Sequence, residues 1–153
     1  MCCSLAGLAC RSPLPVNLPG VPDIPGITSV RLSDEEQIAS ELDDVHRGMQ
    51  SRSIYKVLAH VSRNYHDAEG RDYAALERSL GEFFKRYRDV RITRVAPSVL
   101  VQGDYARAVE TFGTTARPAD AQRDLELFLQ GQVTVNLERI EGKWKIVEWS
   151  RMH

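Results

Sequence analysis

The stretch DLELFLQGQVTVNLERIEGKWKIVEWS, residues 124–150, decides the fold of this chain. Apolar and polar residues alternate through its first half, and this period of two is typical of a strand with one buried face. Glu141-Gly142 is a turn signal that leads into a second alternating run. The stretch therefore predicts two long antiparallel strands, at 124–139 and 143–151. Gly131 interrupts the apolar face of the first strand, and we expect a bend or bulge there.

Two more strands are expected before this hairpin. Residues 90–101 (VRITRVAPSVLV) are rich in β-branched side chains, and Pro97 predicts an edge position or a bulge. Gly103-Asp104 is a hairpin turn signal, after which a strand is expected from about residue 105 to 114. The C-terminal part of the chain is therefore predicted to form a meander of four antiparallel strands.

Three helices are expected upstream of the strands. The first follows the capping-box signal of Ser33 and Glu36, the second covers roughly 53–62, and the third covers roughly 72–88 with Asp72 as its N-cap. Their apolar stripes are Ile38, Leu42, Val45 and Met49; Ile54, Val57, Leu58 and Val61; and Tyr73, Leu76, Leu80, Phe83 or Phe84, and Tyr87. This order predicts an α+β domain, in which three N-terminal helices pack on one face of a curved antiparallel sheet of about four strands.

The head of the chain has a different composition. All three cysteines lie within residues 1–10, and five of the seven prolines lie between positions 13 and 25. Because proline fixes φ and removes a backbone donor, we expect a disordered proline-rich linker at 11–32. Residues 1–10 (MCCSLAGLAC) resemble the end of a bacterial lipoprotein signal, which would make Cys10 the lipid-modified residue and place the protein at the cell envelope, in the periplasm. The alternative is an unstructured head with incidental cysteines, on a cytoplasmic protein.

Charge and hydropathy exclude several classes of function. The net charge is −1, and no apolar run approaches the roughly 20 residues of a membrane helix, so contact with a membrane is expected only through a lipid anchor. Acidic residues interrupt the basic cluster Lys85, Arg86, Arg88, Arg91 and Arg94, which therefore favours a solvated face over nucleic-acid binding.

Neither a metal site nor a cofactor is expected. The adjacent Cys2 and Cys3 have no histidine near them, which argues against zinc. The sequence contains no HExxH motif, no glycine-rich phosphate loop and no GxSxG elbow.

Helices followed by a meander that ends in EGKWKIVEWS (141–150) resemble the nuclear transport factor 2-like superfamily, a cone-shaped α+β fold. That superfamily includes SnoaL-like polyketide cyclases and ketosteroid isomerases. The stretch NYHDAEGRDYAAL (64–76) is similar to small bacterial proteins of the same superfamily, often lipoproteins of unknown function. The resemblance implies a domain over residues 33–153, a pocket at the open end of the cone, and a dimer surface on the outer face of the sheet.

Alternation identifies the candidate pocket residues. Glu110 shares a face with Ala106, Ala108 and Phe112, and in the last strand Glu148 shares the predicted inner face of Trp144. The resemblance adds Tyr65, His66 and Asp67, since superfamily members often place pocket residues after the second helix. The expected ligand pocket is therefore lined by Tyr65, Glu110, Phe112, Trp144 and Glu148.

Two functions remain open. The first is a non-catalytic module that binds a small apolar ligand or forms a homodimer, with Phe128 and Trp149 as aromatic anchors on the outer sheet face. The second is a cyclase, isomerase or dehydratase, with Glu110 or Glu148 as general base and Tyr65 as hydrogen-bond donor. Against the second function, each acid could simply pair with an arginine or lie in water at the rim.

The histidines leave similar alternatives open. His66 and Asp67 could form an acid–base dyad, but a polar turn at the end of a helix explains them equally. His46 and His60 lie near apolar stripes and are expected to be packed or at the surface rather than catalytic.

Overall fold

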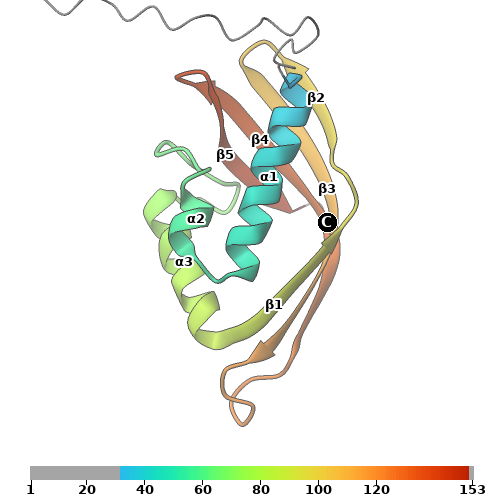
Figure 1. Cartoon of the computed structure of the whole chain (residues 1–153). Helices are drawn as coiled ribbons and strands as arrows, with labels where there is room; N and C mark the ends of the chain where they lie inside the picture. The colour runs from blue at the N-terminus through green and yellow to red at the C-terminus, as the bar shows by residue number, and fades with distance from the viewer. Residues whose placement is uncertain (1–31, 152–153) are drawn as a thin grey trace, which may run out of the picture. The chain divides into compact units, whose positions relative to one another are not determined.

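The computed structural model describes residues 32–151. Cys10 and the expected signal and linker up to residue 31 lie outside the described residues. The elements are α1 (Asp34–Gln50), α2 (Ile54–Leu58), α3 (Tyr73–Arg86), β1 (Tyr87–Arg94), β2 (Ser98–Gln102), β3 (Tyr105–Pro118), β4 (Leu127–Ile140) and β5 (Lys143–Arg151). The predicted α+β class and element order are confirmed, with one strand more than expected (Figure 1).

The helices begin where the sequence predicts. Ser33 Oγ accepts the Glu36 N–H at 3.2 Å and Glu36 Oε2 accepts the Ser33 N–H at 2.8 Å, which completes the capping box of α1. Asp72 caps α3 by accepting the Ala75 N–H at 2.8 Å. The middle helix is shorter than predicted, because the chain leaves α2 to dock on the edge of β5. There Val61 forms an isolated parallel bridge with Ile146.

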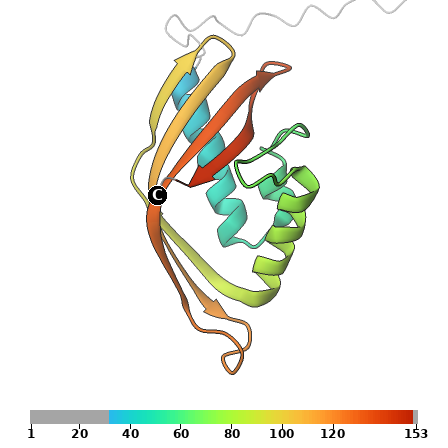
Figure 2. The same cartoon turned by 180° about the vertical axis from the view of Figure 1, so that it is seen from behind.

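The sheet is antiparallel in the order β1-β3-β4-β5, and β2 also pairs with β3 (Figure 2). The single strand predicted at 90–101 is therefore two strands on the same edge of β3, separated at Val95, Ala96 and Pro97. Proline has no N–H to donate to the ladder, which explains why the break falls there. Of the bend or bulge expected at Gly131, the bulge is wrong, since β3 and β4 pair without a shift from Tyr105↔Glu138 to Ala116↔Leu127.

A bulge lies instead in the last strand. Leu137 pairs with Ile146, whereas the preceding Asn136 pairs with Glu148, so Val147 is the extra residue in β5. The carbonyl of Val147 accepts the backbone N–H of His66 at 3.0 Å. One extra residue reverses which side chains of the strand point inward, and this changes the predicted site.

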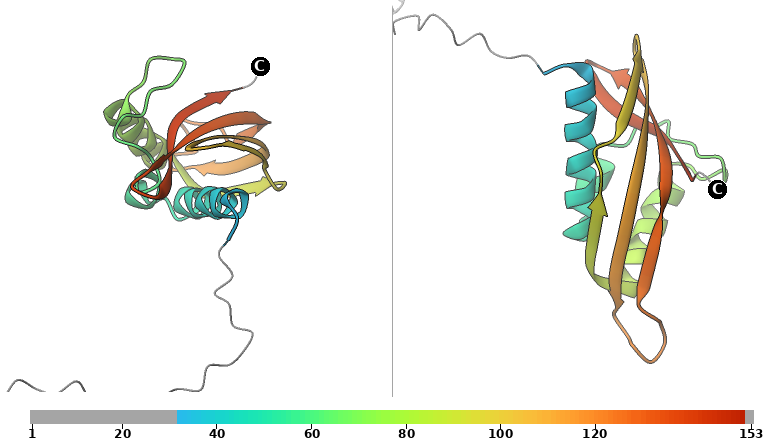
Figure 3. Two further views of the ribbon diagram at one scale, coloured as in Figure 1. Left: turned by 90° about the horizontal axis from the view of Figure 1, so that it is seen from above. Right: turned by 90° about the vertical axis from the view of Figure 1, so that its right-hand side faces the viewer.

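The three helices lie on one face of the curved sheet (Figure 3). Buried side chains from both layers form the core between them. The largest fully buried side chains there are those of Trp144, Tyr65, Ile38, Leu42, Leu137 and Ile146. No helix among residues 32–151 has the length and apolar character needed to cross a membrane.

Candidate functional site

A cluster of four charged or titratable side chains lies between α1 and the sheet. Glu110, on the inner face of β3, is 1% exposed although it is a carboxylate. Its Oε2 lies 3.6 Å from His46 Nε2 on α1, and its Oε1 accepts a hydrogen bond from Arg94 Nη1 on β1 at 3.3 Å. Arg94 also pairs with Asp43 on α1. We call Asp43, His46, Arg94 and Glu110 the inner cluster.

Burial dominates the chemistry of Glu110. Removal from water raises the pKa of this carboxyl above its ordinary value, and the nearby His46 and Arg94 counteract only part of that rise. Arg94 is shared by two carboxylates, so one guanidinium cannot neutralise both. Glu110 therefore combines a raised pKa with a neighbouring imidazole, which is the composition of an acid–base pair.

The two ring nitrogens of His46 have different surroundings. Nε2 faces Glu110, whereas Nδ1 is buried and has no hydrogen-bond partner in the described part of the chain. We expected His46 to be packed or at the surface, and the sequence reasoning missed its contact with Glu110. The available signal was its position four residues after Leu42, on the flank of the apolar stripe.

Its place in the basic cluster of residues 85–94 predicted that Arg94 lies on a solvated face. The structure contradicts this prediction for Arg94. It shares one face of β1 with Val90 and Ile92, and this places its side chain on the inner side of the sheet. The period of two in the sequence could have indicated that Arg94 points inward, but the run of arginines suggested a charged surface instead.

Tyr65 and Asp67 form a separate site. The Tyr65 hydroxyl donates to Asp67 Oδ2 at 3.2 Å, and Arg71 Nε donates to the same oxygen at 2.7 Å. Burial works to raise the pKa of Asp67, but the backbone N–H and guanidinium of Arg71 outweigh it and hold that pKa below its ordinary value. Burial raises the pKa of Tyr65. The Tyr65 hydroxyl is therefore committed to a loop contact.

The side chains of His66 and Asp67 face different surroundings and are not arranged as a dyad. The side chain of His66 is exposed, while that of Asp67 is buried and held by Arg71. The interpretation of this stretch as a polar turn describes the structure better than the dyad does.

The predicted orientations of Glu148 and Trp149 are wrong, because the bulge at Val147 exchanges them. Glu148 pairs with Asn136 on the outer face, where hydrogen bonds from Ser150 Oγ at 2.6 Å and Asn136 Nδ2 at 2.8 Å hold its pKa below its ordinary value. Trp149 pairs with Val135 and packs against the core. Glu148 therefore cannot be the partner of Glu110, and Trp149 cannot anchor a dimer on the outer face.

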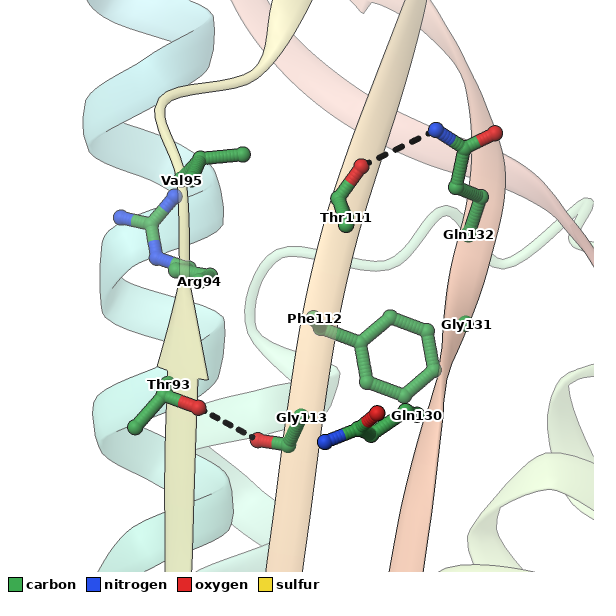
Figure 4. A pocket seen from close by; sticks show the side chains of 9 residues that line it. All are labelled: Thr93, Arg94, Val95, Thr111, Phe112, Gly113, Gln130, Gly131 and Gln132. Carbon is green, nitrogen blue, oxygen red and sulfur yellow. Dashed lines mark hydrogen bonds between the residues drawn. The ribbon is translucent and has the colours of Figure 1, made fainter.

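Phe112 lies beside a groove of about 590 Å³ that crosses β1, β3 and β4 (Figure 4). Its ring lies between β3 and β4 next to Gly131, and the side chain of Arg94 extends towards α1 (Figure 4). Neither Glu110 nor Trp144 lines this groove. The five expected pocket residues are thus distributed over the core, this groove and the outer sheet face.

Within residues 32–151, no group of three or more His, Cys, Asp and Glu side chains is arranged to hold a metal ion. The inner cluster has the composition of a proton-transfer or ion-pair site, with two carboxylates, one imidazole and one guanidinium.

No protein-family model matches this chain, and no curated protein matches it in sequence. Solved structures do match. A proposed scytalone dehydratase from Novosphingobium aromaticivorans is 14% identical at a TM-score of 0.66, covering 76% of this chain and 83% of that one. A nuclear transport factor 2-like superfamily protein from Salmonella enterica is 14% identical at 0.67, covering 78% and 91%.

A proposed dehydratase of the same family from Streptomyces avermitilis is 13% identical at a TM-score of 0.63, covering 78% of this chain and 96% of that one. Similarity at such low identity establishes the fold and leaves the activity open. The chain has the nuclear transport factor 2-like fold, as the resemblance in its sequence implied.

Proposed function

We propose that this domain is a non-catalytic binding module of the bacterial cell envelope that associates with a second copy of itself. The observation that carries the proposal is the filled interior. Trp144 and Tyr65 are almost fully buried where an open cone would hold a ligand, and Glu110 is in contact with Arg94 and His46. Because side chains fill the interior, binding at the outer surface is favoured.

The outer face of the sheet supports self-association. Leu100, Tyr105 and Phe128 are exposed there, and Phe128 is 72% exposed. They alternate with inward residues and pair with Arg107, Glu138 and Thr115, so they point away from the helices. Exposed aromatic side chains on one face are common anchors of protein interfaces.

The experiment is a measurement of molar mass by light scattering. We expect a dimer for the unmodified chain and a monomer for Phe128→Glu, because a charge in the interface would be desolvated without a partner. Tyr55→Glu is the matched control, since Tyr55 is 85% exposed on α2, away from the sheet. A monomeric parent, or a dimer that survives Phe128→Glu, would contradict the interface.

The envelope location rests on Cys10 and the proline-rich stretch that follows it. A lipid on this cysteine would anchor the domain, and the prolines would hold it away from the bilayer. In a bacterial host, the full chain should fractionate with membranes and Cys10→Ser should not. Equal soluble fractions of both chains would remove the anchor from the proposal.

One observation favours an enzyme as the second candidate. The unpartnered Nδ1 of His46 lies on the ring whose other nitrogen faces Glu110, the arrangement of a base oriented by a carboxylate. Two of the similar structures are named as dehydratases. Such a site would remove a proton beside a carbonyl and return a proton to the departing hydroxyl, which releases water.

A panel of β-hydroxyketones tests this candidate, with the absorbance of the conjugated product as readout. Turnover that disappears in both His46→Asn and Glu110→Gln would support the enzyme and overturn the non-catalytic proposal. Turnover that persists in both variants would exclude the inner cluster as its source.

A further inference from the structure

A second hollow lies between α2, α3 and β5, away from the inner cluster. Its volume is about 590 Å³, within the range that holds a small organic molecule. None of the four residues of the inner cluster lines it. The lining residues are Ile54, Tyr55, Leu58, Ala59, Val61, Arg63, Tyr73, Glu77 and Lys145.

The floor of the hollow is apolar. Ile54 and Leu58 of α2 and Val61 beyond it supply aliphatic side chains, and Tyr73 supplies the side of a ring. Leu58 and Val61 belong to the core, while Ile54 and Tyr73 are half-buried at its edge. The hollow can therefore accept a hydrocarbon chain or ring against a floor that the core holds in place.

The rim carries two cations. The Arg63 guanidinium carbon lies 4.3 Å from the centre of the Tyr73 ring, so its planar group is stacked and its N–H donors remain available at the edge. Lys145 Nζ donates to the Ala59 carbonyl at 2.5 Å, which holds the ammonium at the rim with two further N–H groups to offer. Neither Arg63 nor Lys145 forms an ion pair within residues 32–151.

Glu77 is the acid on the same rim, so the charges of the lining side chains sum to +1. An anionic head group suits this balance, and a cation does not. A carboxylate also matches the forked donors of a guanidinium better than a spherical anion does.

We propose that this hollow binds a small amphipathic carboxylate, with its apolar part on the floor and its head group at Arg63 and Lys145. The site is independent of the outer-face interface. None of Leu100, Tyr105 and Phe128 lines the hollow, and its one sheet residue, Lys145, lies on the edge strand β5, so binding and dimerisation can be tested separately.

The test is a titration of the full chain with decanoate, followed by backbone amide NMR shifts. We expect saturable binding with shifts concentrated at 54–63, 73–77 and 145. Decanol, which has the same chain length without the charge, should bind at least about tenfold more weakly, as should decanoate to Arg63→Gln. Lys143→Gln, an exposed change on the same strand outside the lining, should leave decanoate affinity unchanged.

Ala59→Trp provides a test that does not depend on charge. Ala59 is exposed, so an indole there should fill the hollow and abolish binding without altering the core. Arg63→Gln, also at an exposed position, keeps the test decisive if the tryptophan variant fails to fold. Equal affinity for decanoate and decanol, unchanged affinity in Arg63→Gln, or shifts centred on the inner cluster would each overturn the proposal. Tighter binding of an acidic octapeptide at the same residues would replace the small ligand with a peptide partner.

Discussion

Two buried carboxylates in this domain have opposite electrostatics. The side chains of Asp67 and Glu110 are each 1% exposed, yet the pKa of Asp67 lies below its ordinary value and that of Glu110 lies above it. Burial acts in the same direction on both. The difference therefore comes from the partners that each carboxylate finds.

Asp67 is held by its own loop. Its Oδ1 accepts the backbone N–H groups of Glu69 at 3.0 Å and Arg71 at 2.9 Å, while Oδ2 accepts from Tyr65 and Arg71. These donors lie within four residues along the chain, so closing the loop aligns them together. Several short hydrogen bonds to an ionised carboxylate outweigh the cost of its burial.

The partners of Glu110 lie on elements that are distant from it in the sequence. Its partners come from α1 and β1, and the contacts at 3.6 Å and 3.3 Å are longer than those of Asp67. No backbone N–H is among the groups that lower its pKa. The comparison indicates that Asp67 is a structural carboxylate, whereas the partners of Glu110 offset only part of the rise in pKa that burial causes.

The largest expected effect comes from removing the local network. Asp67→Ala leaves two backbone N–H groups and the Tyr65 hydroxyl without their acceptor, which should lower the free energy of unfolding by about 3 kcal/mol in urea denaturation. Glu69→Ala is the control, because its ion pair with Arg71 is exposed and should matter by less than about 1 kcal/mol. Similar losses in the two variants would mean that Asp67 is not the loop's anchor.

A smaller loss is expected when the remote network is broken. Arg94→Met leaves Glu110 buried without its guanidinium, and we expect a loss of about 2 kcal/mol, because Glu110 can respond by taking up a proton. The double variant Arg94→Met, Glu110→Leu should recover most of this stability, since an apolar pair of similar volume avoids the desolvation cost. Losses that simply add in the double-mutant cycle would show that the two side chains are not coupled.

The smallest effect is the dependence of stability on pH. Because the pKa of Glu110 is raised in the folded state, its contribution to stability falls as pH rises above its ordinary value of 4.5. Asp67 has the opposite sign, since its lowered pKa makes its contribution disappear as pH falls below about 3.8. The two carboxylates therefore act in separate pH windows.

Glu110→Gln should flatten the change in unfolding free energy as the pH rises above 4.5, because the raised pKa of Glu110 makes stability fall with pH there. The expected difference is below about 1.4 kcal/mol per pH unit, the limit for one proton. Urea denaturation at several pH values measures it. An unchanged slope in Glu110→Gln would show that this carboxyl does not titrate in that window.

Much of the architecture could be predicted from local pattern. The capping box at Ser33 and the N-cap at Asp72 depend on contacts three residues apart, so the sequence alone contains them. The inward position of Glu110 followed from alternation, and it was correct because β3 pairs with β4 without a shift. Hydrogen bonds between residues close in sequence, and regular apolar periods, can be predicted directly from the sequence.

The composition of the site could not be predicted in the same way. The bulge at Val147 reversed Glu148 and Trp149. The adjacent apolar residues Ile146 and Val147 break the alternation at that point, but two neighbouring apolar residues do not by themselves say which face each later side chain takes. A bulge forms where a neighbouring segment requires it, and here the segment of residues 60–66 docks on the edge of β5 through backbone hydrogen bonds. That contact joins residues about eighty positions apart in sequence.

The sequence by itself determined the order of helices and strands, their caps, and which face of β3 is buried, because each depends on neighbours within a few residues. Only the tertiary structure decided that His46 and Arg94 meet at Glu110, while Tyr65 and Asp67 close their own loop. Convergence of this kind depends on how α1 lies across the sheet. Packing between distant elements sets that geometry, and packing is encoded by the whole set of contacts rather than by a motif.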